Sequence, residues 1–332
     1  MFEINKKFAL NLQLFNNTNV TTATTDGNNL SAEMKTFYSD YLIDNAKPLL
    51  VHDQFGQKHP IPKNGGKTIE FRKYSPFAKA LTPITEGVTP NGNKLNVSTI
   101  TSEVKQYGDY VELSDVLLLT AIDNNLVEAT KLCGNQAGET LDTVTREVLV
   151  GGNNAQFAGG VSARTELGAD NKLTVDECFK AARFLKTQKA KKIGGYFVAI
   201  IHPDVAYDLM RSADWVNANQ YAGSTALFEG EIGKMAGIRF VETTEAKIFE
   251  KAGKGGKDVY ATLVLGADAY GVTEVEGGGL QHIVKQLGSA GTADPLNQRS
   301  TVGWKAIKTA EILVEAFMVR IESCSTFDSG AN

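Results

Sequence analysis

The side chains that most often carry out chemistry in proteins are spread thinly along this sequence. The four histidines form no His-Glu-x-x-His frame and the three cysteines form no Cys-x-x-Cys pair, so neither of these zinc-binding patterns is present. Cys178 falls on the apolar face of an expected helix, which indicates a core residue rather than a nucleophile. His202 precedes an expected helix start and is interpreted as a capping or surface residue. Ser289 lies outside a nucleophile-elbow pattern.

Two glycine-containing segments match phosphate-binding loops only in part. Residues 65–68 read Gly-Gly-Lys-Thr, but a Walker motif needs another glycine at the position of Ile61. Residues 253–256 contain three glycines, but the third glycine of a dinucleotide fingerprint would fall at Asp258. The first segment is interpreted as a turn that enters a strand, and the second as a flexible surface loop. The sequence therefore predicts no catalytic, cofactor-binding or metal-ligating residue, and no cofactor.

Four lysines, Lys186, Lys189, Lys191 and Lys192, crowd the end of an expected helix over 174–192. Cations are favourable near the C-terminus of a helix, which is a sufficient structural explanation. A nucleic-acid-binding patch is the alternative. The formal net charge of −4, the presence of only eight arginines among 34 basic residues and the lack of interleaved aromatic side chains weigh against it.

The length and composition of the chain are those of an ordinary folded protein. A chain of 332 residues suggests roughly two domains. With 42% hydrophobic and 22% charged residues it is not a disordered or collagen-like chain. The longest apolar runs, 116–119 and 196–201, are much shorter than a membrane span and are expected to be buried. Three distant cysteines and the lack of a signal peptide favour synthesis in a reducing, cytoplasmic compartment.

A cluster of prolines is the least ordinary feature. Six of the eight prolines lie within residues 48–90. Residues 68–72 alternate as a strand does, and 96–113 return in an extended, β-branched pattern. The simplest interpretation is a long two-stranded excursion with little core of its own. Because an isolated hairpin is only marginally stable in water, we expect this excursion to lie on another surface.

The strongest predicted helix follows this excursion. Apolar residues recur every three or four positions over 123–150, with Asp123 as the expected N-cap and Gly151 as the stop. Before the prolines, 31–46 can form a helix that Pro48 ends, and the Asn- and Thr-rich residues 1–29 are expected to be a mobile arm. After the long helix we expect two further helices, starting at Thr174 and Pro203, and strands over residues 196–201, 237–241, 259–265, 280–287 and 303–322.

The order of these parts resembles the Hong Kong 97-like fold of tailed-bacteriophage major capsid proteins, an α+β fold. Local sequence is similar as well. Residues 83–87 (PITEG) followed by 106–115 (QYGDYVELSD) look like the extended loop and its exit in a large major-capsid family. The resemblance extends to later segments in the same order: 228–233 (FEGEIG), 237–243 (GIRFVET), 265–271 (LGADAYG), 294–299 (DPLNQR) and 302–305 (VGWK).

This resemblance implies a domain organisation over nearly the whole chain. It implies an N-terminal arm over 1–64, an extended β-hairpin loop over 65–105 that lies on a neighbouring subunit, and a peripheral domain over 106–173 that contains the spine helix 123–150. It further implies an axial domain over 174–285, near five-fold and six-fold axes, and a return to the peripheral domain over 286–332.

The same resemblance implies contacts and partners. Candidate inter-subunit contact residues in the extended loop are Arg72, Lys79, Pro83, Glu86 and Lys94. Some capsids of this fold form an isopeptide bond from a loop lysine, but that motif is not matched here and no crosslink is predicted. The expected partners are other copies of the chain in hexamers and pentamers, a separate scaffolding protein, a portal, and enclosed DNA that is not read by sequence. No membrane is expected.

The resemblance implies a non-enzymatic function. The chain is expected to be a major capsid protein that assembles in the host bacterial cytoplasm into the icosahedral head shell around double-stranded DNA, and to reside in the virion. Two alternatives stay open at this stage. One is an encapsulin-like subunit of a cellular protein compartment. The other is a soluble α/β enzyme with an unrecognised site.

Overall fold

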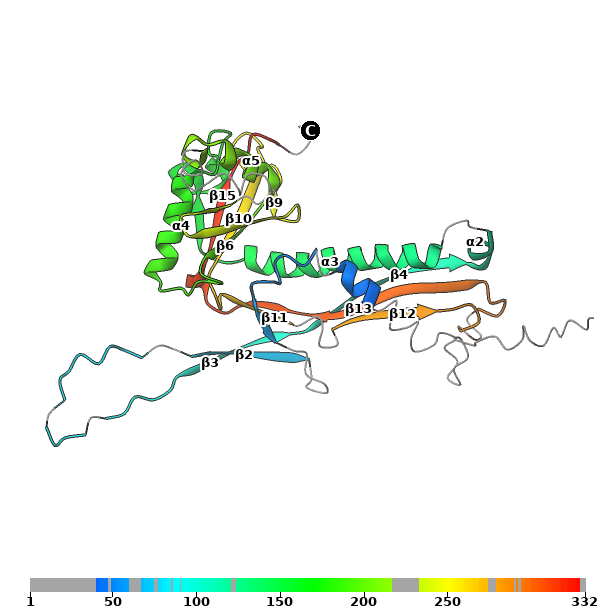
Figure 1. The fold of residues 1–332 in the computed structure, drawn as a ribbon, viewed down its shortest axis with the longest axis horizontal. Coiled ribbons are helices and arrows are strands. Elements are labelled where there is room, and N and C mark those ends of the chain that lie inside the picture. Colours follow the sequence, from blue (N-terminus) through cyan, green and yellow to red (C-terminus); the bar gives the residue numbers. More distant parts are fainter. Residues whose placement is uncertain are drawn as a thin grey trace, which may run out of the picture.

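The structure is a computed structural model that describes residues 40–46, 49–59, 67–74, 77–84, 86–89, 91–120, 124–216, 233–273, 279–289, 291 and 294–328. Figure 1 shows three parts: a long flat body, a compact head over one end of that body, and an extended loop that projects beyond the head. We use "body", "head" and "loop" for these parts. The predicted helix over 31–46 is helical over 40–46, and the predicted arm over 1–29 lies outside the described residues.

The body is built on α3 (Asn125–Val150), the predicted spine helix. Its 26 residues extend about 39 Å at 1.5 Å per residue. The helix starts after Asn124, one residue later than predicted, and ends at Gly151 as predicted. The helical residues 40–46 cross α3 in close contact: a Cβ atom at Gly134 would lie 2.9 Å from the Leu42 carbonyl oxygen, so only glycine permits this approach.

One face of a three-stranded sheet packs against α3. The strand order is β12 (Leu280–Lys285), β13 (Arg299–Lys308) and β4 (Lys105–Ser114), all antiparallel. Alternate residues of β13, among them Val302, Trp304 and Ala306, point into a core shared with Leu141 of α3. Gln136 of α3 accepts a hydrogen bond from the Trp304 indole N–H at 3.0 Å, which fixes the helix over the sheet.

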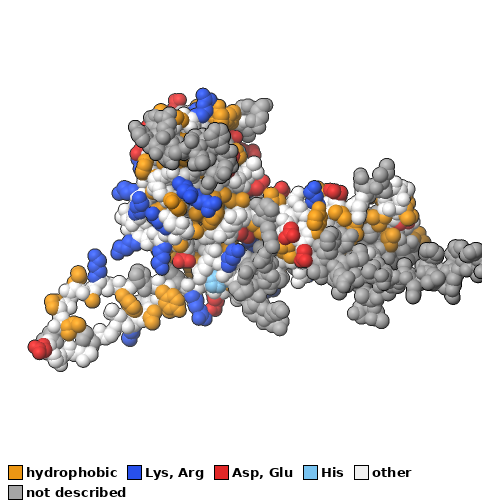
Figure 2. All heavy atoms as spheres, viewed as in Figure 1, with side chains coloured by type: hydrophobic (Ala, Val, Ile, Leu, Met, Phe, Trp, Pro, Cys, Tyr) orange, Lys and Arg blue, Asp and Glu red, His pale blue; other side chains and the backbone are white. Residues whose placement is uncertain are grey.

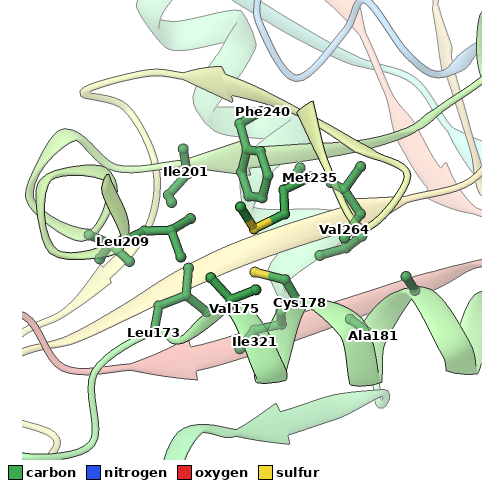
Figure 3. Close-up of a cluster of buried hydrophobic side chains, with 14 of the residues drawn as sticks. Leu173, Val175, Cys178, Ala181, Ile201, Leu209, Met235, Phe240, Val264 and Ile321 are labelled. Carbon is green, nitrogen blue, oxygen red and sulfur yellow. The ribbon is translucent and has the colours of Figure 1, made fainter. Parts of the chain in front are cut away.

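The head contains a mixed sheet in the order β5 (Ala155–Phe157), β15 (Met318–Ser323), β10 (Val259–Leu265), β6 (Phe197–Ile201), β8 (Ile238–Glu242) and β7 (Lys234–Met235), with β9 (Ile248–Phe249) paired to β10. Two helices, α4 (Val175–Thr187) and α5 (Pro203–Arg211), cover one face. Figure 3 shows Cys178 and Ala181 of α4 directed toward Ile201, Val264 and Ile321 of this sheet.

The opposite face of the head sheet rests on the end of the body. Ile200 and Leu265 share a buried cluster with Leu149 and Val150 of α3. A small sheet lies beside them, in the order β1 (Gln57–His59), β11 (Tyr270–Thr273) and β14 (Ala310–Ile312). The remaining described elements are the hairpin strands β2 (Thr68–Tyr74) and β3 (Val97–Glu103), α2 (Asp115–Thr120), and the 3-10 helices η3 (Ala158–Gly160), η4 (Arg164–Glu166) and η6 (Glu315–Phe317).

Buried charged side chains join the segment before the loop to the body. His52 Nδ1 lies 2.6 Å from Asp142 Oδ2 of α3. The Lys308 ammonium of β13 pairs with Asp53, which also accepts a hydrogen bond from the Thr145 hydroxyl at 2.6 Å. All five residues are buried, so these pairs hold three distant segments in one arrangement.

A second buried ionic group joins the head to α3. The Glu322 carboxylate is fully buried and accepts hydrogen bonds from Arg164 and Arg320, each at 2.7 Å. Arg320 also donates to the carbonyl oxygens of Val150 and Gly152 at the end of α3. A cation at this position satisfies carbonyl groups that the helix leaves unpaired.

Several predicted elements differ from the structure. The predicted single strand over 303–322 is wrong: it divides into β13, β14, η6 and β15, and the three strands among these lie in three different sheets. The helix predicted to reach about residue 192 ends at Thr187, and Lys189 has a φ of 57°, which a helix cannot contain. The run 116–119 was expected to be buried but lies in α2, where none of the described residues is buried.

Two strands pair with partners that lie in a different expected domain range. Strand β12 falls within the range 174–285 assigned to the axial domain, yet it pairs with β13 in the body sheet. Strand β15 falls within the range 286–332 assigned to the peripheral domain, yet it pairs with β10 and β5 in the head sheet. The physical reason is that strand partners are set by three-dimensional packing, which local residue patterns do not reveal.

Candidate assembly surfaces

The loop is anchored at its base and open beyond it. Strands β2 and β3 pair from Thr68↔Glu103 to Tyr74↔Val97. At the base, Phe71 is fully buried, and its ring fills the space where a side chain at Gly271 would lie. Beyond Tyr74 the described residues 77–84, 86–89 and 91–96 form no helix or strand. The hairpin is therefore fixed to the body at one end and lacks a core at the other.

The open part of the loop exposes large apolar side chains. Leu81 is 82% exposed, Ile84 75% and Leu95 69%, and Phe77 and Val88 are exposed as well. Several large apolar side chains exposed on one segment make it a candidate site of interaction. Among the described residues, no helix is long and apolar enough to cross a membrane.

All five candidate contact residues named from the sequence lie on this loop, and all are exposed: Arg72, Lys79, Pro83, Glu86 and Lys94. Arg72 is on β2, and the other four are on the open part. The structure brings none of them into an ion pair with another described residue. Their side chains are thus available to another molecule.

A second apolar surface lies at the far end of the body, where α2 packs beside β4 (Figure 1). Leu119 is 83% exposed, and Val116 and Leu117 are also exposed. Leu296, on the connection that leads into β13, is exposed too. This surface could not be predicted from the sequence, because a short apolar run by itself does not distinguish a buried helix from a contact surface.

A shallow groove crosses the face of the body sheet opposite α3. It has a volume of about 620 Å³, and its lining includes Tyr110, Ile283 and Lys305. Gly108 and Gly303 lie in the same region, and each is closely covered by the neighbouring strand, so that a Cβ atom at Gly303 would lie 2.7 Å from the Cβ of Tyr110. Close strand contact at these glycines shapes the groove floor.

The candidate chemical residues occupy structural positions. Burial raises the pKa of the Cys178 thiol to about 12, with a smaller contribution from the charge of Glu177, so the reactive thiolate is not formed at neutral pH. His202 is the N-cap of α5 and accepts the Asp204 backbone N–H through Nδ1 at 3.2 Å, as predicted. Residues 253–256 form bends and a turn between β9 and β10, in the segment interpreted from the sequence as a surface loop. The described part of the chain contains no group of three or more His, Cys, Asp or Glu side chains placed to hold a metal ion.

Comparison with known proteins places the chain in a family. The family model described as "Phage capsid protein" matches residues 119–289, just over half of the chain. The chain belongs to the phage capsid protein family. A search of curated protein sequences finds no match.

Solved structures agree with this family. The capsid of cyanophage Pam1 superimposes with a TM-score of 0.66 at 15% sequence identity, covering 86% of this chain and 93% of the Pam1 chain. The capsid of cyanophage P-SCSP1u gives a TM-score of 0.64 at 15% identity, with 83% and 89% covered. A virus-like particle from Pyrococcus furiosus gives 0.51 at 11% identity, with 87% and 100% covered.

This phage capsid protein therefore has the Hong Kong 97-like fold, as the sequence predicts. It is a structural protein, a major capsid protein of the head shell, and its location is the capsid of the virion. Membership of a phage capsid family favours the head shell over the encapsulin-like alternative and over an α/β enzyme.

Proposed function

We propose that this capsid protein builds the shell by laying its loop on the body of a neighbouring copy. The observation that carries this proposal is the exposed apolar surface of the loop beyond Tyr74 and Val97, which the described part of the chain leaves uncovered. Burial of apolar surface is the main favourable term in protein association. An extended arm without a core becomes stable when a partner supplies the missing surface.

The contact residues serve this proposal in two ways. Leu81 and Ile84 supply apolar area, and Lys79, Glu86 and Lys94 surround it with charge. A polar rim around an apolar centre is the usual arrangement of a specific interface. Pro83 restricts the backbone between the two apolar residues, which lowers the entropy lost when the loop is ordered on its partner.

The proposal also concerns where the head and the body lie in the shell and which partners take part in assembly. We infer that the head lies near the five-fold and six-fold axes, so that copies form hexamers and pentamers, and that the body lies at the periphery of these rings. Closed rings of one chain use heterologous contacts, in which two different surfaces of each copy meet. A separate scaffolding protein would guide assembly in the host cytoplasm, a portal would complete the head, and the shell would enclose DNA without reading it or catalysing a reaction.

Replacement of the loop tests this proposal. The terminal pair Tyr74↔Val97 permits residues 75–96 to be replaced by Asn-Gly, a two-residue turn that suits a hairpin. We expect the shortened chain to fold as a subunit with an unchanged thermal midpoint and to form no shells in electron micrographs, whereas the full chain forms them. Shells from the shortened chain, or its failure to fold, would contradict the proposed role of the loop.

A further inference from the structure

A concentrated positive surface lies at the end of α4 and in the segment that follows. Its side chains are all exposed, and none forms an ion pair with another described residue: Arg183, Lys186, Lys189, Lys191 and Lys192. We call these five residues the basic edge. Figure 2 shows Lys and Arg side chains gathered on the side of the head that carries α4. Since the chain has a formal net charge of −4, removing these five positive charges leaves −9 on the rest.

The helix dipole does not account for this basic edge. Because α4 ends at Thr187, only Arg183 and Lys186 lie in its last turns. Lys191 and Lys192 lie beyond a residue with positive φ, in the connection to β6. In contrast, Lys180 on the same helix pairs with Asp176 at 2.8 Å and Glu177 at 3.0 Å. The basic edge is thus a set of cations that the described fold does not neutralise.

Negative charge gathers at the other end of the same sheet. Burial lowers the pKa of His202, and the negative charges of Asp204, Glu242 and Glu245 around it act in the opposite direction. Glu245 lies beside Arg146 of α3, and the neighbouring Glu147 pairs with Lys247. We call the following acids the acidic end: Glu147, Asp204, Glu242, Glu245 and Glu250. With the adjoining cations Arg146, Lys247 and Lys251 included, this surface has a formal charge of −2.

The strands of the head separate these two surfaces. Strands β6 and β8 are parallel, and their register runs from Phe197↔Ile238 to Ile201↔Glu242. Lys192 lies at the starting end, since its Nζ is 3.9 Å from the position that a Cβ of Gly237 would occupy. Glu242 lies at the finishing end. Five residues at about 3.3 Å each place the two surfaces roughly 16 Å or more apart, at opposite ends of the sheet.

We infer that in the assembled ring the basic edge of one head faces the acidic end of the next. This inference rests on the proposed function, because it assumes rings of heterologous contacts around the heads. A single chain that carries both charges can repeat such a contact around a closed ring. A two-fold contact would instead place like charges together. Complementary charge of this kind sets orientation and association rate more than it adds affinity.

Charge reversal tests this inference. The basic-edge variant is Lys191→Glu/Lys192→Glu, and the acidic-end variant is Glu242→Lys/Glu250→Lys. Both sets of side chains are exposed, so the variants should keep the native circular dichroism spectrum and thermal midpoint. The matched control for the basic-edge variant is Lys131→Glu/Lys254→Glu, which makes the same net charge change at exposed positions that belong to neither named set.

The readout is the lowest protein concentration at which light scattering detects shells at low salt. We expect about a tenfold rise for each reversal variant, a smaller effect at high salt, and little change for the control. The combined fourfold variant exchanges the two charges, so it should recover most of the lost assembly.

Three outcomes would overturn the inference. The first is native-like assembly of both reversal variants. The second is a fourfold variant that assembles no better than either reversal variant. The third is normal assembly of Lys191→Glu/Lys192→Glu with lost retention of double-stranded DNA, which would assign the basic edge to nucleic acid. If the native chain forms no shells under any condition, the proposed function fails rather than this inference.

Discussion

Replacement of Leu81 by Ser measures how much the loop contributes to assembly. The Leu81 side chain is 82% exposed in the unassembled chain and touches no core. Complete burial of a leucine contributes about 1.5–3 kcal/mol, so burying the exposed part on a neighbour would contribute about 1.2–2.5 kcal/mol per copy. The same substitution should change the free energy of unfolding of the subunit by about 0.5 kcal/mol or less, because no buried contact is lost.

These energies convert into a measurable change in assembly. At 1.4 kcal/mol for each factor of ten, the critical concentration for shell formation should rise about 7- to 60-fold. Light scattering over a dilution series gives this concentration, and size-exclusion chromatography gives the remaining free subunit. Leu81→Met is the control, since it keeps the volume and apolar character and should assemble as the native chain does.

Two results would refute the reasoning about Leu81. An unchanged critical concentration would show that the side chain stays in solvent within the shell. A thermal midpoint several degrees lower in the free subunit would show that Leu81 belongs to the fold of its own chain rather than to a contact.

Three further predictions concern the subunit itself. Lys308→Ala leaves the Asp53 carboxylate buried without its cation, so it should lower the free energy of unfolding by about 3–5 kcal/mol in urea titrations. Adding Asp53→Asn should recover part of that loss, whereas a loss below about 1 kcal/mol for Lys308→Ala would contradict the ion pair. The Cys178 thiol, whose pKa burial raises to about 12, should react with iodoacetamide in urea but not in the native chain at pH 8, as read by mass spectrometry; native labelling would contradict its burial. Burial raises the pKa of Asp208, but hydrogen bonds from Thr326 and Ser325 outweigh it and hold this pKa below the usual 3.8. A carboxylate whose pKa is lowered by folding stabilises the native state above pH 3.8, and this contribution is lost as the pH falls through its lower native value. Hydrogen exchange should therefore show the amide of Thr326 losing protection in that acid range and keeping it at pH 5, whereas loss of protection at pH 5 would contradict the assignment.

The local parts of this fold could be predicted from residue patterns. The three- and four-residue spacing of apolar side chains predicted α3 to within a residue or two, because a helix buries one stripe against its sheet. The Thr174 cap of α4 also formed, with its hydroxyl accepting the Glu177 backbone N–H. The apolar spacing and the cap each involve residues close together in the sequence. Helices of this kind can therefore be predicted without knowledge of the tertiary packing.

Long-range pairing could not be predicted in the same way. Lys308 and Asp53 are 255 positions apart, and nothing near either residue marks the other as its partner. The segment 303–322 alternates like one strand, but its parts join three sheets because the chain turns at Thr309 and at η6. The partner of a strand or of a buried charge depends on which surfaces the folded chain brings together.

Of the candidate surfaces, one could be predicted from local sequence and the others depend on long-range packing. Proline spacing indicated the loop, since an extended, core-poor segment is visible in local sequence. The apolar surface of α2 and the charge separation of the head were not indicated, because exposure and opposite placement are properties of the fold. The lysines around residue 190 are visible in the sequence, but a helix predicted to reach residue 192 makes them look like cations at a helix C-terminus, whereas α4 ends at Thr187.

The position of the loop in the assembled shell tests the central claim most directly. A cryo-electron microscopy map of purified shells would show where residues 77–95 lie. We predict that Leu81 and Ile84 are buried against the body of a neighbouring copy while Phe71 stays in the core of its own chain. A loop folded back on its own body, or one that stays exposed in a closed shell, would contradict this account.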